Sequence, residues 1–267
     1  YSGSGGGSLA QAVSYWKSLQ SILTGQESWV IINIGNEPAS DAYVNSCASA
    51  TRNAIISMRN AGFRHTLMVD GSGWGQDTAH VMLNNATSLE AADPMHNTIF
   101  SVHMYGVYAS GSTVDSYISS FYNTGMPFLV GEFGSTDPSV SWSDDANQIM
   151  ADTQSRGIGY MAWSWSGNSG GSLDMTVNFN PNQRTAWGNR VITGANGLQQ
   201  TSRECSCYGG GSKPTPTPPS GGGGKYYKII NRNSGQALDI SGSSTVNGGL
   251  AIQWPYSGSN NEQWQEV

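Results

Sequence analysis

Five short apolar runs recur along this chain, and the residues at their carboxyl ends lie 29 to 33 positions apart. Those end residues are Glu37, Asp70, His103, Glu132 and Trp163. Apolar runs of this kind, bounded by turn residues, are typical of fully buried parallel strands. A strand and its following helix need about 30 residues, and eight such units close a barrel of about 250 residues. The spacing therefore predicts strands alternating with helices around a parallel sheet.

Helical periodicity fills the intervals between the runs. Apolar side chains recur at helical spacing from Leu9 to Leu23 and again from Val44 to Met58. Alternating strands and helices indicate the α/β class, and the repeat length favours a (β/α)8 TIM barrel. A doubly wound sheet is the alternative that the pattern leaves open.

Two of the end residues are glutamates. Glu37 follows Trp29-Val30-Ile31-Ile32, and Glu132 follows Pro127-Phe128-Leu129-Val130. The carboxyl ends of barrel strands form the face on which substrates bind. Two carboxylates facing each other across that face are the minimum for hydrolysing a glycosidic bond, so the residues predict a glycosidase. The residues alone leave open which glutamate is the acid.

The composition is consistent with action on a neutral polymer. The 267 residues carry a net charge of -6, only 11% are charged, and nine are tryptophan. This is neither a disordered nor a nucleic-acid-binding composition, so we expect no nucleic acid partner. Tryptophan and tyrosine suit stacking on pyranose rings, although we expect any single tryptophan more often in the core. We expect no membrane span, because no stretch of 18 apolar residues occurs. We also expect a monomer.

Cysteine is scarce and does not suggest a metal site. The three cysteines are Cys47, Cys205 and Cys207, and no histidine joins them at a zinc-like spacing. Cys205 and Cys207 are too close in sequence for an easy mutual disulfide. We therefore expect no metal, and at least one thiol that is free or lacks its partner.

A linker divides the chain. Residues 209–224 read GGGSKPTPTPPSGGGG, whose Pro-Thr centre and glycine ends make a semi-rigid tether. It separates a catalytic domain at 1–208 from a module at 225–267, which with 43 residues is too short for a full core of its own. Linkers of this kind suit enzymes that work on polymers outside the cell, so we expect a secreted, extracellular protein.

Four motifs carry a family resemblance. They are Gly35-Asn36-Glu37-Pro38, Gly73-Trp74-Gly75-Gln76-Asp77, Ser101-Val102-His103-Met104-Tyr105 and Ala162-Trp163-Ser164-Trp165-Ser166-Gly167-Asn168. In this order, across roughly residues 9–197, they resemble family 5 of the glycoside hydrolases, and within it the bacterial endo-β-1,4-mannanases. The resemblance implies an eight-stranded barrel and a retaining enzyme that acts on β-mannan polysaccharides without a metal or organic cofactor. It makes Glu37 the acid/base and Glu132 the nucleophile, about 5–5.5 Å apart.

The same resemblance assigns roles to the neighbouring residues. Asn36 would bind the sugar 2-hydroxyl, and Tyr105 would donate a hydrogen bond to the nucleophile. His103 would contact the acid/base or the sugar beside it. The aromatic walls would come from Trp163 as the stacking residue, with Trp165 as an alternative on the same strand face, and from Trp74 at a flanking subsite.

The segment after the linker resembles a ricin-type β-trefoil lectin repeat. The resemblance lies in Ser234-Gly235-Gln236-Ala237-Leu238-Asp239, Gln253-Trp254 and Asn261-Glu262-Gln263-Trp264. It implies that Asp239 and Asn261 bind sugar hydroxyls above an aromatic ring, either Trp254 or Tyr256. The Gln263-Trp264 pair is chiefly a core signature.

Two departures limit both resemblances. Only 28 residues precede the first apolar run, where the family has three strand-helix units and a supporting arginine on the second strand. The lectin segment has one repeat where a trefoil has three. We therefore expect a TIM barrel lacking about three N-terminal strand-helix units, followed by a partial β-trefoil. The rival functions are an endo-β-1,4-glucanase and a carbohydrate-binding fragment without turnover.

Overall fold

The computed structural model describes most of the chain in two compact units, Tyr1–Ser202 and Arg203–Val267. The described residues are 8–38, 44–134, 139, 143–169, 171–203, 226–231, 233–246 and 249–265. The predicted linker at 209–224 lies outside them, as do Cys205 and Cys207. The domain boundaries expected from the sequence therefore stay predictions, and each unit is described by itself.

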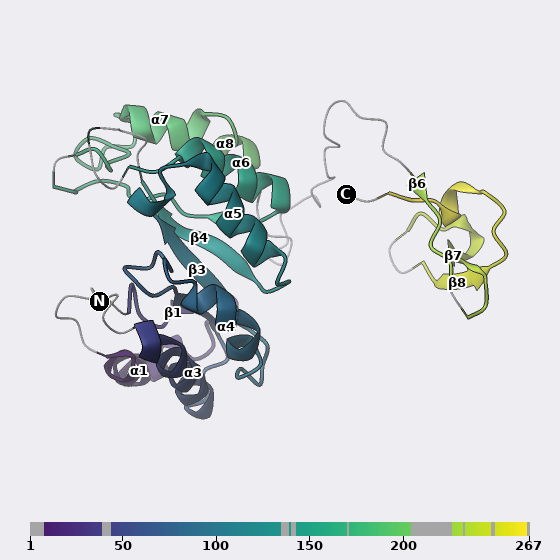
Figure 1. Ribbon diagram of the computed structural model, residues 1–267, viewed down its shortest axis with the longest axis horizontal. Coiled ribbons are helices and arrows are strands. Elements are labelled where there is room, and N and C mark those ends of the chain that lie inside the picture. Colours follow the sequence, from purple (N-terminus) through teal and green to yellow (C-terminus); the bar gives the residue numbers. More distant parts are fainter. Residues whose placement is uncertain are drawn as a thin grey trace. The chain divides into compact units, whose positions relative to one another are not determined.

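The first unit is built on one parallel sheet (Figure 1). Its strands are β1 (Ile31–Asn33), β2 (Thr66–Asp70), β3 (Thr98–Met104), β4 (Phe128–Phe133) and β5 (Gly159–Tyr160). They pair in the order β1-β2-β3-β4-β5, each parallel to its neighbour. A doubly wound sheet reverses its strand order at a switch point, and this sheet does not. The prediction of consecutive barrel-type strands is confirmed, and the doubly wound alternative is wrong.

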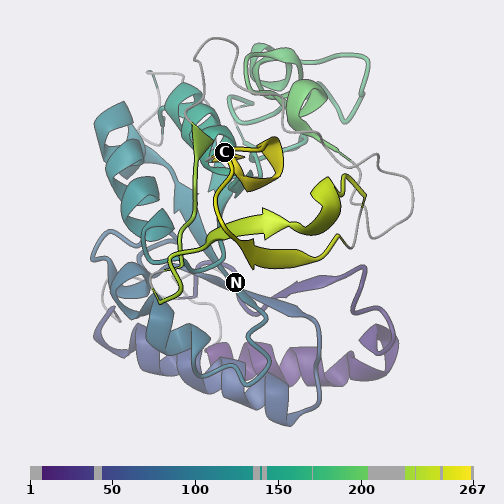
Figure 2. The same ribbon diagram turned by 90° about the vertical axis from the view of Figure 1, so that its right-hand side faces the viewer.

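Two helices precede β1, and further helices follow the strands along the chain. They are α1 (Leu9–Ser18), α2 (Gln20–Leu23), α3 (Val44–Asn60), α4 (Val81–Glu90), η2 (Gly106–Tyr108), α5 (Gly111–Tyr122), α6 (Ala146–Arg156), α7 (Ala186–Thr193) and α8 (Leu198–Thr201). Figures 1 and 2 show the longer helices around the outside of the sheet. The helix predicted from Leu9 to Leu23 is interrupted at Leu19, where the backbone leaves the helical region. A capping box between Ser8 and Gln11 begins α1.

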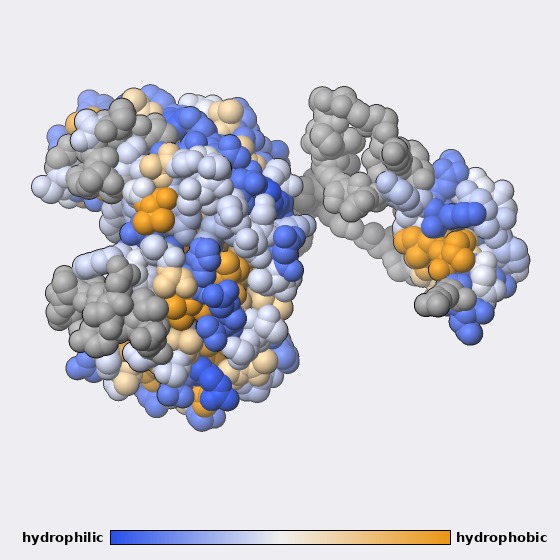
Figure 3. Space-filling view, in the orientation of Figure 1, coloured by the Kyte–Doolittle hydropathy of each residue, from blue (hydrophilic) through white to orange (hydrophobic). Residues whose placement is uncertain are grey.

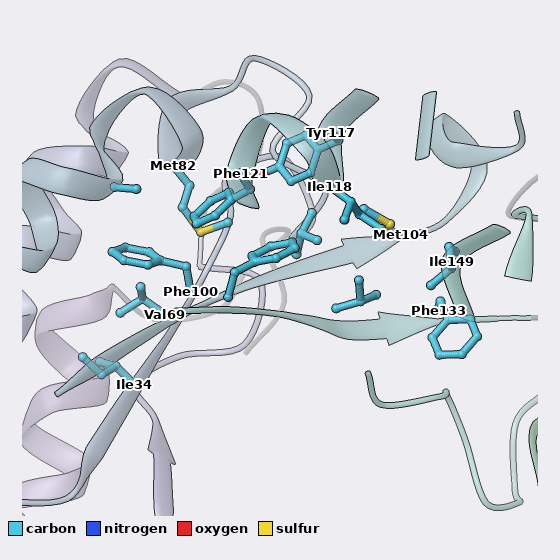
Figure 4. Packing of buried hydrophobic residues seen from close by; sticks show 14 of the residues in the cluster. Ile34, Val69, Met82, Phe100, Met104, Tyr117, Ile118, Phe121, Phe133 and Ile149 are labelled. Atoms are coloured by element: carbon cyan, nitrogen blue, oxygen red, sulfur yellow. The ribbon is translucent and has the colours of Figure 1, made fainter. Parts of the chain in front are cut away.

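The core lies between the sheet and its helices. Figure 4 shows Ile118 of α5 beside Met104 of β3, and Phe121 of α5 between Tyr117 and the strands. The rings of Phe100 and Phe121 have centroids 5.6 Å apart, and Phe121 stacks on Phe128 of β4 at 4.3 Å. Each such buried side chain stabilises the fold by about 1.5–3 kcal/mol. This packing fixes the strands whose carboxyl ends carry the candidate site.

The first strand departs from the sequence prediction. The run at 29–32 is predicted to be fully buried, but Trp29 and Ile31 are 69% and 57% exposed. Among the described strands, β1 pairs only with β2, so it is an edge strand with one open side. Ile32 is fully buried, as the core-facing residue of an alternating strand. The prediction of burial is therefore wrong for half of this run.

The second unit contains two antiparallel strand pairs. Strand β7 (Ala237–Ile240) pairs with β8 (Ala251–Trp254), and β6 (Tyr226–Tyr227) pairs with β9 (Trp264–Gln265) (Figure 2). Two short 3-10 helices, η4 (Ser241–Ser243) and η5 (Asn260–Glu262), complete it. Among its described residues, Ala237 is the single buried hydrophobic one. Figure 3 shows a patch of hydrophobic residues on its visible face, so this unit has very little core.

No helix in the described part of the first or second unit is both long and apolar enough to cross a bilayer.

Candidate active site

The candidate site lies at the carboxyl ends of the parallel strands. Glu37 follows β1, Asp70 ends β2, and Tyr105 directly follows β3. His103 of β3 stands in register with Glu132 of β4. Because parallel neighbours end at the same edge of a sheet, these side chains meet there. The sequence placed Glu132 just beyond its strand, whereas it lies within β4, one residue from its end.

The two predicted catalytic glutamates are close together. One oxygen of Glu37, one oxygen of Glu132 and one ring nitrogen of His103 all lie within 4.8 Å of one another. Retaining glycosidases hold their two carboxyl groups about 5–5.5 Å apart, whereas inverting enzymes need about 6.5–9.5 Å. The geometry therefore suits a nucleophile that reaches the anomeric carbon directly. A cation could bind to the same three atoms, so the expectation of no metal stays a prediction.

Both predicted partners of the glutamates are in contact with them. Nδ1 of His103 lies 3.0 Å from Oε1 of Glu37 and 3.6 Å from Oε2 of Glu132. The hydroxyl of Tyr105 donates to Oε2 of Glu132 at 2.8 Å. The structure thus brings together four of the residues predicted for the site.

Burial and charge set the protonation of this cluster. Burial raises the pKa of Glu132, and the charge of His103 and the hydrogen bond from Tyr105 oppose that rise only in part. Burial lowers the pKa of His103, but the hydrogen bond to Glu37 and the charges of Asp70, Glu132 and Glu37 outweigh it, so the net pKa is raised. Burial and the charge of Glu132 raise the pKa of Tyr105, which keeps its hydroxyl a donor. A nucleophile acts as a carboxylate, so Glu132 depends on His103 and Tyr105 for its charged form.

Asp70 belongs to the same cluster, although its position in the sequence indicated only the end of a strand. Its side chain is fully buried. Its Oδ2 accepts the backbone N–H of Glu37 at 3.1 Å and lies 3.4 Å from Nε2 of His103. One feature of the sequence could have indicated a role for Asp70. It ends the apolar run that lies between the runs ending at Glu37 and His103, both of which were assigned functions.

A tight turn after β2 packs against His103 and accepts a hydrogen bond from its backbone. Gly75 has φ +74, and a Cβ added there would lie 2.6 Å from the ring of His103. Its carbonyl oxygen accepts the N–H of His103 at 2.8 Å. Only glycine permits both the backbone conformation and the close approach. The preceding Trp74 is 39% exposed, on the loop where the sequence predicted a flanking wall.

Trp163 and Trp165 are similarly exposed, at 43% and 42%, but their anchoring differs. The N–H of Trp163 donates to the carbonyl of Phe133 at 2.8 Å, which fixes it beside the strand that carries Glu132. Its ring nitrogen donates to Asn168 at 3.1 Å. The contacts favour Trp163 over Trp165 as the residue nearest the nucleophile.

Most of the described tryptophans lie outside the core. Among the described tryptophans only Trp187 is buried, at 5% exposure. The expectation that a given tryptophan is more often a core residue is therefore wrong for the tryptophans that the structure describes. Five of the described rings are exposed, namely Trp29, Trp74, Trp163, Trp165 and Trp254.

Asn36 is half-buried on the wall of a cavity of about 530 Å³ beside β1. The cavity is lined by Gln11, Ala12, Tyr15, Trp16, Asn33, Ile34, Gly35 and Asn36. The position next to Glu37 agrees with the expected contact to a sugar hydroxyl, which stays a prediction.

Two other polar residues singled out by the sequence are structural. Asp77 is fully buried and accepts the N–H groups of Met82 and Leu83 at the start of α4 and the hydroxyl of Tyr117. Cys47 is a buried free thiol on α3. Neither has a recorded contact with the glutamates.

In the second unit the predicted sugar ligands are neighbours. The side-chain amide of Asn261 donates to Oδ1 of Asp239 at 2.6 Å and to the carbonyl of Ile240 at 3.3 Å. Asp239 is 5% exposed, whereas Trp254 is 59% and Tyr256 45% exposed. The ring nitrogen of Trp264 donates to the carbonyl oxygen of Leu238, a contact within the unit that agrees with a structural role for this tryptophan. Asn261 of η5 therefore lies against Asp239 and Ile240 of β7, and the sugar contacts of Asp239 and Asn261 stay predictions.

Comparison with known proteins is consistent with this geometry. Residues 3–169 match the cellulase family (glycosyl hydrolase family 5), and residues 217–267 match the ricin-type beta-trefoil lectin domain-like family. A mannan endo-1,4-beta-mannosidase of Streptomyces lividans is 46% identical over 225 residues, which cover 83% of this chain and 58% of that protein. Beta-mannanase/endoglucanase A of Caldicellulosiruptor saccharolyticus is 46% identical over 196 residues, 73% of this chain and 15% of that protein.

A solved structure is similar as well. The mannohexaose complex of the beta-mannanase from Thermomonospora fusca has a TM-score of 0.72 at 46% identity and covers 77% of this chain and 68% of that one. The chain thus spans little more than half of the Streptomyces relative. The sheet, its helices and the matched residues together show that the chain belongs to glycosyl hydrolase family 5, the cellulase family of TIM-barrel hydrolases, and carries a ricin-type β-trefoil lectin-like segment.

Proposed function

We propose that this chain forms the catalytic part of a retaining endo-β-1,4-mannanase, which hydrolyses internal bonds of mannan, glucomannan or galactomannan. The observation that carries the proposal is the approach of Glu37, His103 and Glu132 to within 4.8 Å at the carboxyl edge of the sheet. That separation favours a double displacement with retention of configuration. The names of the Streptomyces relative and of the mannohexaose complex support mannan as the substrate class.

In the first step Glu132 attacks the anomeric carbon as a carboxylate, and Glu37 donates its proton to the glycosidic oxygen. The bond to the leaving sugar breaks, and a glycosyl ester forms on Glu132. The hydroxyl of Tyr105, 2.8 Å from Oε2 of Glu132, stabilises the carboxylate before the attack. His103 faces both glutamates and supports whichever of them is charged.

In the second step water replaces the leaving sugar. Glu37, now ionised, takes a proton from that water, and the resulting hydroxyl attacks the anomeric carbon. The ester bond breaks, and Glu132 regains its charge while Glu37 regains its proton. Neither step uses a metal or an organic cofactor. Trp163 offers the aromatic face for the sugar ring, and Asn36 offers its amide to the 2-hydroxyl.

An endo-β-1,4-glucanase is the second candidate. The Caldicellulosiruptor relative is named for both activities, and glucan and mannan cleavage need the same carboxylate pair. The experiment is release of reducing ends from galactomannan and from carboxymethylcellulose by the same preparation. We expect at least tenfold faster release from galactomannan. Equal or faster release from carboxymethylcellulose would overturn the mannanase assignment, and sugar binding without release from either would favour a non-catalytic role.

We further propose that the protein acts outside the cell, where polymeric mannan is found, and that its second unit holds it on the polymer. The Pro-Thr linker and the Asp239–Asn261 pair support this. Detection of the protein in culture supernatant rather than in washed cells is the test of secretion.

A further inference from the structure

The carboxylate of Asp70 joins three segments of the candidate site. Its Oδ2 accepts the backbone N–H of Glu37 at 3.1 Å, and both its oxygens lie 3.2 Å from the amide nitrogen of Asn33. The same Oδ2 lies 3.4 Å from Nε2 of His103. The side chain is fully buried. A buried carboxylate stays charged only where hydrogen-bond donors and positive charge surround it. Here Asn33 of β1, the backbone N–H of Glu37 and the ring of His103 on β3 supply them.

The first of these contacts fixes the backbone of Glu37. This residue has φ +48, in the left-handed region that residues with a Cβ rarely adopt. A conformation of this kind persists only where the surrounding structure holds it. The hydrogen bond from its N–H to Asp70 is the described contact that does so.

The second contact acts on the charge of His103. Its Nδ1 faces Glu37 at 3.0 Å and Glu132 at 3.6 Å, while Nε2 faces Asp70 at 3.4 Å. A neutral imidazole donates from only one nitrogen, whereas the imidazolium donates from both. With carboxylates facing both nitrogens, the imidazolium fits this position. Tyr105, the remaining titratable group recorded at this cluster, faces Glu132 as a neutral donor.

We propose that Asp70 is a positioning residue of the candidate active site, which holds His103 as an imidazolium between the two glutamates and fixes the turn that presents Glu37. The role in catalysis rests on the proposed glycosidase function. In the first step the positive charge favours ionised Glu132, and in the second it favours ionised Glu37. Asp70 itself touches neither the sugar nor the reacting atoms.

The replacement Asp70→Asn separates the two roles. Asparagine keeps an oxygen that accepts the N–H of Glu37 but removes the negative charge beside Nε2. The measurement is an NMR titration of the histidine side chains in the full chain, which has only four histidines. An opposite charge within about 4–6 Å shifts a pKa by one to three units, so the pKa of His103 should fall by about one to two units in the variant.

A matched control is Asp152→Asn. Asp152 is also a largely buried aspartate, at 7% exposure, but its partners are Gln148 and Arg156 on α6. This variant should leave the titration of His103 unchanged. An unchanged titration of His103 in Asp70→Asn as well would overturn the proposal, because Asp70 would then be only a structural acceptor.

Two further variants keep the test valid if Asp70→Asn does not fold. In Glu37→Gln and in Glu132→Gln a single, partly exposed carboxylate is lost while Asp70 remains. The pKa of His103 should stay above its ordinary value in each, and a return to that value in either would contradict the proposal.

The titration needs no turnover. A parent that binds mannan without hydrolysing it would therefore overturn the proposed function and leave the role of Asp70 to be decided by NMR. Where turnover is present, the alkaline limb of kcat/KM should move to lower pH in Asp70→Asn.

Discussion

The hydroxyl of Tyr105 donates a hydrogen bond of 2.8 Å to Oε2 of Glu132, across the ends of β3 and β4. Burial raises the pKa of Glu132, and this hydrogen bond is one of two described interactions that lower it. The proposed nucleophile therefore depends on a neighbouring strand for its charge.

Replacing Tyr105 with Phe should reduce kcat/KM on mannan by about 10- to 100-fold, since a hydrogen bond to a charged group contributes about 1.5–3 kcal/mol. The pKa of Glu132 should rise further, so the acidic limb of the pH profile should move to higher pH. Steady-state kinetics across pH 4 to 9 give both quantities. Tyr122→Phe, at an exposed position on α5, is the control and should behave as the parent does. An unshifted acidic limb in Tyr105→Phe would contradict this account of Glu132.

Asp144 predicts a pH dependence of stability. Burial raises its pKa to about 8, although the N–H of Gly134 donates to it. A raised carboxyl pKa means that the folded state binds the proton more tightly than the unfolded state does. Its contribution to stability is thus complete below about pH 4 and is lost as the pH rises through 8.

In Asp144→Asn the loss of stability between pH 4 and 8 should therefore be smaller. At pH 8 the variant should exceed the parent by on the order of 2 kcal/mol in the free energy of unfolding. Urea unfolding at several pH values measures this. The control Asp145→Asn keeps an equally good N-cap residue at the start of α6, so it should preserve most of the pH dependence of the parent. Parallel curves for Asp144→Asn and the parent would refute the assigned pKa.

The open side of β1 predicts self-association. Ile31 is 57% exposed on a strand with one described neighbour, and Trp29 beside it is 69% exposed. Unpaired edge strands with apolar side chains template intermolecular pairing, and a charge on such an edge suppresses it. We therefore expect the chain of 267 residues expressed alone to be aggregation-prone or inactive, and Ile31→Lys to increase its monomer fraction. Light scattering measures the change, with Ser21→Lys at an exposed helical site as the control. A parent that is already monomeric, active and cooperatively melting would show that the edge is protected.

The second unit should act on polymer binding rather than on bond cleavage. Deleting residues 209–267 should lower activity on insoluble mannan more than on short soluble oligosaccharides. Asp239→Ala should weaken retention on mannan several-fold, because it removes the acceptor for Asn261 and the proposed ligand of a sugar hydroxyl. Pull-down on insoluble mannan reports the binding. Equal losses on soluble and insoluble substrates would indicate that the unit supports the catalytic fold instead.

The sequence predicts that the side chains of the candidate site lie close together, because parallel strands end at one edge of a sheet. Once the spacing establishes consecutive parallel strands, Glu37, His103 and Glu132 must lie at the same end of the sheet, whatever the loops do. Tyr105 stands two residues after His103, so its side chain lies on the same face of the strand, and this explains its contact with Glu132. Pattern and topology together determine these positions.

Three features depend on tertiary contacts that no local pattern contains. The run at Trp29–Ile32 is equally apolar on an open edge and inside a closed sheet, so its exposure depends on neighbours and not on its own residues. Asp70 is one polar strand end among several, and its role arises from three segments far apart in the chain. The exposure of Trp163 depends on its anchoring to Phe133 and Asn168.

The division of labour between the two glutamates is tested most directly by Glu132→Gln and Glu37→Gln, each assayed on mannan and on an aryl mannoside with a good leaving group. Glu132→Gln should be inactive on both substrates, because no nucleophile remains to form the glycosyl ester. Glu37→Gln should lose activity on mannan but keep measurable ester formation from the aryl mannoside, whose leaving group needs little help from an acid. Activity of Glu132→Gln equal to that of the parent on either substrate would contradict the central claim.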